Sequence, residues 1–115
     1  ALLATGFRVG KKIEIDEQVE VMRRLVYKTR GVRRAGAAAY DLCLVAQGVI
    51  DGFWERSLSP WDTAAGTLLV REAGGVVTNY SGKTYAPHMP DIVAGSPLLQ
   101  RPLLEEIASV LAPRP

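Results

Sequence analysis

The sequence has very little of what disulfide-linked, zinc-binding or histidine-dependent proteins need. Cys43 is the only cysteine and His88 the only histidine among the 115 residues. One cysteine excludes an internal disulfide and a cysteine-rich zinc site, which agrees with a reducing compartment. His88 stands in a proline-flanked loop without a second histidine, a cysteine or an acid at ligand spacing. We therefore assign it no catalytic role.

Long apolar runs and a strong excess of one charge are also missing. No apolar stretch approaches the roughly 20 residues of a membrane span, and the first residues lack a signal-peptide pattern. Fourteen Lys and Arg against twelve Asp and Glu leave a net charge of only +2. Nucleic-acid binding usually requires a larger basic excess gathered on one surface. We expect a cytoplasmic protein with neither a membrane nor a nucleic acid as partner.

What is present is an alternation of strand and helix patterns within one unit, residues 1–115. Buried-strand composition is found near residues 1–4, 32–34, 49–55, 76–78 and 92–94, and helical spacing over 16–29, 37–47, about 62–73 and 97–111. Asp16 is placed to cap the first helix, and we expect Pro102 to restart the last one. This order predicts an α/β fold, with a mostly parallel sheet covered by helices on both sides.

Asp62 is the first candidate for chemistry, because it stands where the third helix begins. The small side chains of Thr63, Ala64, Ala65 and Gly66 follow it and would let a ligand or a neighbouring backbone come close. One interpretation is an N-cap that accepts hydrogen bonds from the free N–H groups of the helix. The other is a ligand for a hard cation such as Mg²⁺, which prefers carboxylate oxygens. The residues alone leave both open.

Glu55 and the segment Gly36–Ala38 are further candidates. Glu55 closes an aromatic strand, where open α/β sheets bind their ligands; it could bind hydroxyl groups or be an ordinary exposed residue beside Arg56. Gly36, Ala37 and Ala38 begin a helix whose N–H groups could face an oxygen-rich ligand. The same small residues could instead serve close packing of the helix on the sheet.

Together these segments resemble the inositol monophosphatase family. The string Trp61-Asp62-Thr63-Ala64-Ala65-Gly66, followed by Glu72-Ala73-Gly74-Gly75, is similar to the C-terminal signature of that family. Ala4–Phe7, Arg34–Ala38 and Ile92–Gly95 resemble other elements of it, so the likeness extends over nearly the whole chain. It implies the C-terminal half of the family's layered α/β sandwich. The opening strand composition at Ala1–Ala4 agrees with a chain that begins inside the fold.

The resemblance also implies roles for the candidate residues. Asp62 corresponds to a metal ligand of the family, and Glu55 to a residue that contacts substrate hydroxyls. The backbone of Gly36, Ala37 and Ala38 would line the same pocket. The family usually has Ser or Thr where this chain has Ala37, so one polar contact is lost there. Family members are commonly homodimers, which implies a dimer for this protein.

The family hydrolyses phosphate monoesters with two or three Mg²⁺ ions, most of whose ligands lie in an upstream Glu and a D-x-[DI]-[DG]-T-like run. Neither is found in this sequence, whose other aspartates, Asp16, Asp41, Asp51 and Asp91, are spread along the chain. We therefore expect a missing N-terminal half, and no appreciable phosphatase activity from these residues alone. The expected substrate of the whole protein is inositol monophosphate or a similar small ester.

Two alternatives follow from the same residues. A sister activity, such as fructose-1,6-bisphosphatase, NADP phosphatase or histidinol-phosphate phosphatase, would use the same signature with a different pocket. A non-catalytic α/β assembly module could have kept the signature for packing. A D-x-[DI]-[DG]-T run upstream, or stabilisation by Mg²⁺, would favour the enzyme.

Overall fold

The computed structural model describes residues 2–6, 12–33, 37–56, 58 and 60–111. These residues form five strands and four helices, close to the ranges that the sequence predicts. In chain order they are β1 (Leu2–Thr5), α1 (Lys12–Lys28), β2 (Gly31–Arg33), α2 (Ala38–Ala46), β3 (Gly52–Arg56), α3 (Pro60–Glu72), β4 (Val76–Thr78), β5 (Asp91–Gly95) and α4 (Pro97–Leu111).

Two helix boundaries differ from the prediction. α1 begins at Lys12, so Asp16 lies inside the helix and is not its cap. α4 runs without interruption from Pro97 to Leu111, with Pro102 inside it. Pro102 is the sixth residue of α4, so its missing N–H removes the one hydrogen bond that would have gone to the Leu98 carbonyl, and the helix continues past it.

The sheet has the strand order β2-β1-β3-β5-β4. β1 pairs in parallel with β2 and β3, whereas β5 pairs antiparallel with β3 and β4. Four strands therefore run in one direction and β5 runs against them, which confirms a mostly parallel sheet. The reversal of β5 follows from its connection, because residues 79–90 contain no helix that could carry the chain back across the sheet.

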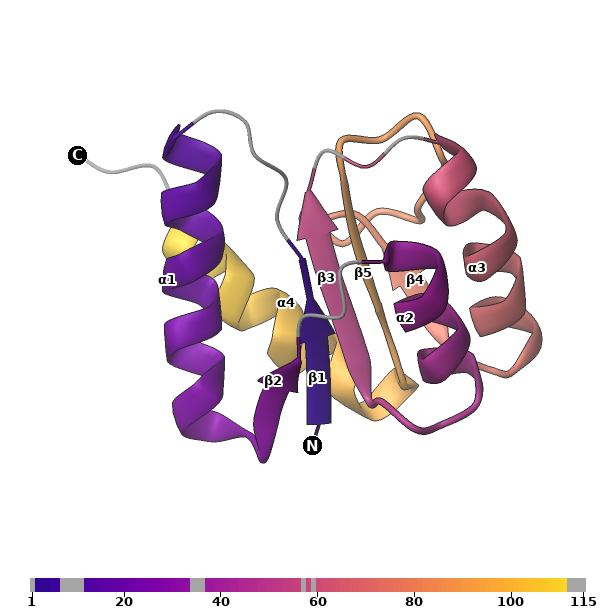
Figure 1. Cartoon of the computed structure of the whole chain (residues 1–115), viewed down its shortest axis with the longest axis horizontal. Helices are drawn as coiled ribbons and strands as arrows, with labels where there is room; N and C mark the ends of the chain where they lie inside the picture. The colour runs from indigo at the N-terminus through magenta and orange to yellow at the C-terminus, as the bar shows by residue number, and fades with distance from the viewer. Residues whose placement is uncertain (1, 7–11, 34–36, 57, 59, 112–115) are drawn as a thin grey trace.

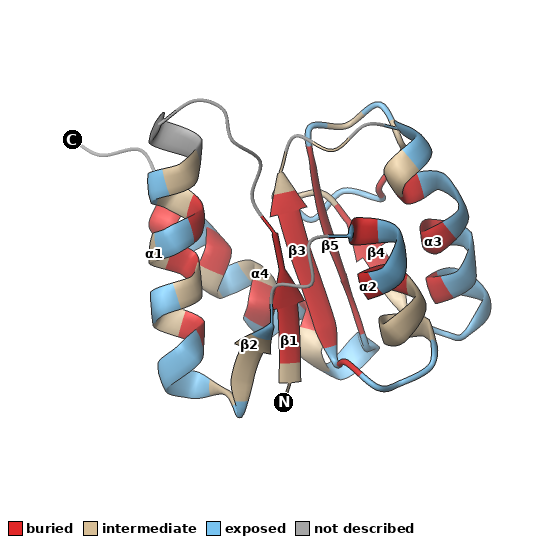
Figure 2. Ribbon diagram, in the orientation of Figure 1, coloured by how far each residue is buried: buried red, intermediate tan, exposed pale blue. Residues whose placement is uncertain are grey.

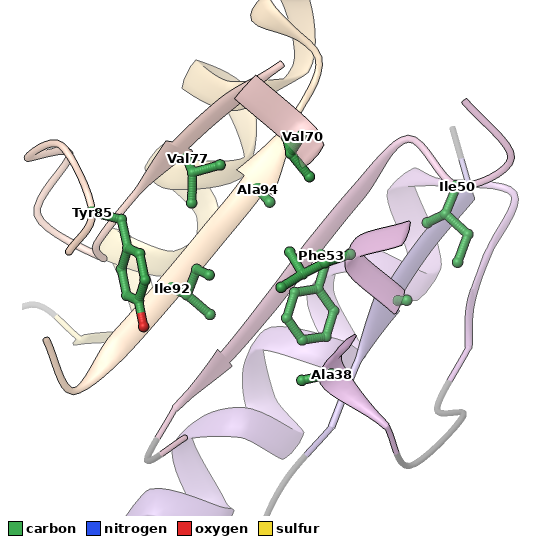
Figure 3. Packing of buried hydrophobic residues seen from close by; sticks show 10 residues of the cluster. Ala38, Ile50, Phe53, Val70, Val77, Tyr85, Ile92 and Ala94 are labelled. Carbon is green, nitrogen blue, oxygen red and sulfur yellow. The ribbon is translucent and has the colours of Figure 1, made fainter. Parts of the chain in front are cut away.

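Helices cover both faces of this sheet, with α1 and α4 on one side and α2 and α3 on the other (Figure 1). Successive residues of β3 divide between the layers: Phe53 packs in the cluster with α2 and α3, and Trp54 in the cluster with α1 and α4. Figure 2 shows the resulting band of buried strands between the helices. Figure 3 shows Phe53, Ile92 and Ala94 in the α2–α3 cluster. The sheet is thus the middle of three layers, and each of its faces forms a separate hydrophobic core with one pair of helices.

α2 and α3 pack closely because Gly66 has no side chain. A Cβ at position 66 would lie 2.6 Å from Cβ and Cδ1 of Leu42, which is fully buried on α2. The small residues at the start of α3 therefore serve helix packing as well as any ligand. This close contact sets the position of the first turn of α3, which carries Asp62.

Candidate active site

The carboxyl ends of the parallel strands and the first turns of α2 and α3 lie at the same end of the sheet (Figure 1). This follows from the connections, because a strand that ends there is followed by a helix that begins there and runs back. Ala38, Glu55 and Asp62 are therefore brought to one end, which we call the strand-end site. Gly36 lies outside the described residues.

Glu55 is buried at this end of β3, with 6% of its surface exposed. It lies opposite Ile92 of β5 and directly against Gly6, which follows β1. A Cβ at position 6 would lie 3.0 Å from the Glu55 carboxyl carbon, so glycine leaves the room that the carboxylate occupies. The interpretation of Glu55 as an ordinary exposed residue was wrong. A carboxylate buried at the end of the sheet where open α/β proteins bind their ligands is a candidate for function.

Asp62 lies in the first turn of α3, two residues after Pro60, and is half-buried. It is not at the capping position, so the N-cap interpretation was wrong. A carboxylate in the first turn is stabilised by the positive end of the helix dipole. Its charge reaches Tyr85, whose pKa is raised mainly by burial and further by Asp91 and Asp62. The neutral Tyr85 hydroxyl lies 2.8 Å from the Thr63 hydroxyl and ties this turn to the loop before β5.

Ala37 and Ala38 form the start of α2 in the strand-end site. Ala38 is the first residue of the helix and is buried, and Ala37 is the exposed N-cap with extended backbone angles, φ −144° and ψ 103°. No side chain caps this helix end. The absence of a hydroxyl at position 37 thus leaves a first-turn N–H group without its usual partner.

Ala37→Ser is expected to stabilise the chain by about 0.5–2 kcal/mol, because a serine hydroxyl at the N-cap accepts a hydrogen bond from the first turn of α2. The free energy of unfolding in urea measures the change. Ala39→Ser, at an exposed position inside the same helix, is the matched control and should lower stability by a few tenths of a kcal/mol (about 0.3–0.5). Equal effects of the two substitutions would contradict the capping role of residue 37.

Asp91 also lies at this end, and the sequence analysis missed it. It is the first residue of β5, opposite Arg56 of β3, and is 9% exposed. Its Oδ1 accepts a hydrogen bond of 2.6 Å from the Tyr80 backbone N–H. Because β5 is antiparallel, its first residue lies where the other strands end. The sequence between residues 78 and 91 has no helical pattern, and this could have predicted that β5 is antiparallel and that Asp91 lies at this end.

A polar network holds α1 against β3 just behind Glu55. The Trp54 indole N–H donates to Gln18 Oε1 at 3.0 Å, and Gln18 Nε2 donates to the Tyr80 hydroxyl at 2.9 Å. Arg56 pairs with Glu17 at 2.6 Å and lies 5.9 Å from the centroid of the Tyr80 ring. Burial raises the pKa of Tyr80, so its hydroxyl remains a neutral partner. These contacts fix the strand that presents Glu55.

Within the residues that the structure describes, no group of three or more His, Cys, Asp and Glu is placed to hold a metal ion. Asp62 nevertheless has the donor chemistry that Mg²⁺ prefers: a carboxylate on a rigid helix turn, half open to its surroundings. It fits the expected metal as a single ligand. A Mg²⁺ site here would need further oxygen ligands besides Asp62.

Asp41 is an unexpected buried acid in the first turn of α2. It is 1% exposed, and among the residues that the structure describes neither carboxylate oxygen has a hydrogen-bond partner. Burial raises its pKa to about 6, from a usual 3.8. From the sequence it was only one of the aspartates spread along the chain. An unpaired buried carboxylate lowers the stability of the folded chain when it is ionised.

This pKa makes the contribution of Asp41 to stability depend on pH. Between about pH 4 and 6 the folded chain keeps a proton that the unfolded chain has lost, so the free energy of unfolding falls as pH rises through this window. Asp41→Asn cannot titrate. Its free energy of unfolding, relative to the unmodified chain, should therefore be higher at pH 7 than at pH 4 by up to about 3 kcal/mol.

Urea unfolding at pH 4, 5 and 7 measures this difference. Asp16→Asn, at an exposed position of α1, is the matched control, and its difference should stay nearly constant. If the stability of the Asp41→Asn chain changed with pH in parallel with that of the unmodified chain, Asp41 would not be a buried carboxylate that titrates in this range.

With a three-layer α/β fold and acidic residues gathered where its parallel strands end, the molecule has the architecture of a ligand-binding α/β protein. The chain belongs to the inositol monophosphatase family, whose model matches residues 1–113. It is 44% identical over 108 residues to the putative Nus factor SuhB of Neisseria meningitidis serogroup B. It is 46% identical over 93 residues to the inositol-1-monophosphatase of Mesorhizobium japonicum.

Solved structures agree with this assignment. The Thermotoga maritima IMPase has a TM-score of 0.85 at 30% identity, over 96% of this chain and 41% of that one. The extragenic suppressor protein suhB of Bartonella henselae has a TM-score of 0.81 at 38% identity, over 92% and 41%. The chain likewise spans 41% of the Neisseria relative and 35% of the Mesorhizobium relative, and thus well under half of either.

Among the described residues, no helix is both long and apolar enough to cross a bilayer.

Proposed function

We propose that this chain forms the substrate wall, and supplies one metal ligand, of a Mg²⁺-dependent phosphatase that hydrolyses inositol monophosphate or a similar small phosphate monoester. The observation that carries the proposal is the buried Glu55 carboxylate held against Gly6, at the same end of the sheet as Asp62. Membership of the inositol monophosphatase family supports it.

Each residue has a chemical task in this proposal. Glu55 accepts hydrogen bonds from substrate hydroxyl groups and orients the ring, as a desolvated carboxylate does strongly. The N–H groups at the start of α2, at Ala37 and Ala38, bind the oxygen atoms of the same ligand. Gly36, which lies outside the described residues, is assigned to this segment by the family resemblance alone. Asp62 holds Mg²⁺. Such ions, two or three in the complete site, would supply Lewis-acid polarisation of the phosphate and an activated water for attack in line on phosphorus.

The remaining ligands and the phosphate cradle come, in this proposal, from an N-terminal half that precedes these residues in the whole protein. The whole protein would be a cytoplasmic homodimer. Its substrate could also be that of a sister phosphatase, since the pocket is completed outside this chain. The candidates are fructose-1,6-bisphosphate, NADP and histidinol phosphate.

Phosphate release tests the proposal. The 115-residue chain alone should release no phosphate from inositol-1-phosphate with Mg²⁺ above the rate without protein. A family-length chimera, in which this chain replaces the matched segment of the Mesorhizobium japonicum inositol-1-monophosphatase, should be active on at least one of the esters above. Turnover by the chain alone, or a folded chimera inactive on every ester, would contradict it.

A non-catalytic assembly role is a second candidate, because several similar relatives are named Nus factors. The chimera separates the two proposals. If it folds and binds Mg²⁺ but hydrolyses none of the esters, assembly is the better account.

A further inference from the structure

Glu55 is flanked in β3 by two side chains that are both attached to α1. Trp54 precedes it and Arg56 follows it, and because side chains alternate along a strand, both lie on the opposite face of the sheet from Glu55. The Trp54 indole N–H donates a hydrogen bond of 3.0 Å to Gln18 Oε1. Arg56 forms an ion pair of 2.6 Å with Glu17. Two consecutive residues of one helix thus hold both neighbours of Glu55.

The attachment at Gln18 is the more deeply buried of the two. Gln18 is 4% exposed, whereas 28% of each side chain in the Arg56–Glu17 pair is exposed. Water screens a partly exposed ion pair, so its net contribution is small. A buried amide keeps its hydrogen bonds without competition from water, and its partners lose much when it is removed. Gln18 is therefore the residue of α1 on which the position of this end of β3 depends most.

Tyr80 extends the same network to a second acid of the strand-end site. Its hydroxyl accepts a hydrogen bond of 2.9 Å from Gln18 Nε2. Its backbone N–H donates one of 2.6 Å to Asp91 Oδ1. Burial raises the pKa of Tyr80 most, and the negative charges of Asp91 and Glu55 raise it further. The Tyr80 side chain therefore lies within electrostatic reach of both acids while it is hydrogen-bonded to Gln18.

We propose that Gln18 is a positioning residue for Glu55: its amide, by holding the preceding strand residue and Tyr80, fixes the place of the carboxylate that binds ligand hydroxyl groups. Gln18 itself lies behind the site, on the face of the sheet that α1 and α4 cover (Figure 1). The inference rests on the proposed function of Glu55. A binding group displaced by only about 1 Å loses much of its effect, so a residue behind the site can set affinity.

Gln18→Met in the chimera tests this, because it removes the hydrogen bonds of the amide and nearly keeps its volume. The KM for inositol-1-phosphate is expected to rise about tenfold while kcat changes by no more than about twofold, since ring binding is lost and the phosphate chemistry is not. Phenyl phosphate has no ring hydroxyl groups, so its inhibition constant as a competitor should stay within about twofold. A loss of stability alone would not separate the two compounds.

Val21→Ala is the matched control. Val21 is 1% exposed, one turn further along α1 in the same core, and has no polar side chain with which to join the network. This substitution should destabilise the protein and leave both constants unchanged. Tyr80→Phe, which removes one hydroxyl and keeps the ring, should raise the KM by a smaller factor, about threefold. A rise in KM that is equal in Gln18→Met and Val21→Ala, or that is matched by phenyl phosphate, would overturn the proposal.

Glu55→Gln separates this inference from the proposed function. If it leaves the KM for inositol-1-phosphate unchanged, the hydroxyl-binding role of Glu55 is wrong, and the positioning role of Gln18 is wrong with it. If Glu55→Gln raises the KM and Gln18→Met does not, only the positioning role is wrong.

Carbon NMR of the 115-residue chain tests the same point without activity, and serves also if the chimera does not fold. The side-chain carboxyl resonance of Glu55 is assigned by its absence in Glu55→Gln. Gln18→Met should move this resonance, because the carboxylate changes its surroundings, and Val21→Ala should leave it in place. A Glu55 resonance that Gln18→Met does not move would overturn the proposal.

Discussion

Trp54→Ala is expected to lower the free energy of unfolding by about 3–5 kcal/mol, which is much of the total for a domain of this size. Trp54 is fully buried and is the largest such side chain among the described residues. Its removal leaves a cavity in the α1–α4 core. It also takes the indole N–H away from the buried Gln18 Oε1, which would keep only the longer hydrogen bond of 3.2 Å from the Tyr80 hydroxyl.

Urea unfolding followed by circular dichroism measures this loss. The chain offers its own matched control, because its other tryptophan, Trp61, is 80% exposed. Trp61→Ala in the 115-residue chain should change stability by no more than about 0.5 kcal/mol. If both substitutions moved the unfolding midpoint equally, Trp54 would not have the packing role that we assign to it.

Asp62→Asn in the chimera is expected to lower phosphatase activity by about 100-fold or more. Even groups that only orient a metal ligand contribute about 10–100-fold, and an amide has no charge with which to hold Mg²⁺. The Mg²⁺ concentration for half-maximal activity should rise as well. The fold should survive, since the side chain keeps its size and loses only about 0.3–1 kcal/mol of interaction with the helix dipole.

Glu72→Gln is the matched control, because Glu72 is an exposed carboxylate at the other end of the same helix. It should leave both the activity and the Mg²⁺ dependence unchanged. An Asp62→Asn chimera that keeps its activity and its Mg²⁺ dependence would remove Asp62 from the metal site. A loss of activity with an unchanged Mg²⁺ dependence would do the same.

Much of the fold could be predicted from the sequence because its signals are local. Periodic apolar residues, followed by glycine, marked α3 through Glu72-Ala73-Gly74-Gly75. The errors at Asp16 and Pro102 are errors of helix boundaries, where a capping residue or a proline has several possible positions. For the strand-end site, Asp62 and Glu55 could be proposed from their places at the ends of elements. The sequence could not decide between the alternative interpretations of these two residues.

The remaining features depend on contacts between residues distant in the sequence. The reversal of β5, which brings Asp91 to the strand-end site, depends on which strands pair. The burial of Glu55 depends on Gly6, and that of Asp41 on everything packed around α2. The burial of a side chain depends on all of its contacts, and most of these are with residues distant in the sequence, so a local sequence pattern cannot predict it. The sequence by itself determined the family, the elements and Asp62 as a candidate; the tertiary structure decided which acids are buried and which end of the sheet they share.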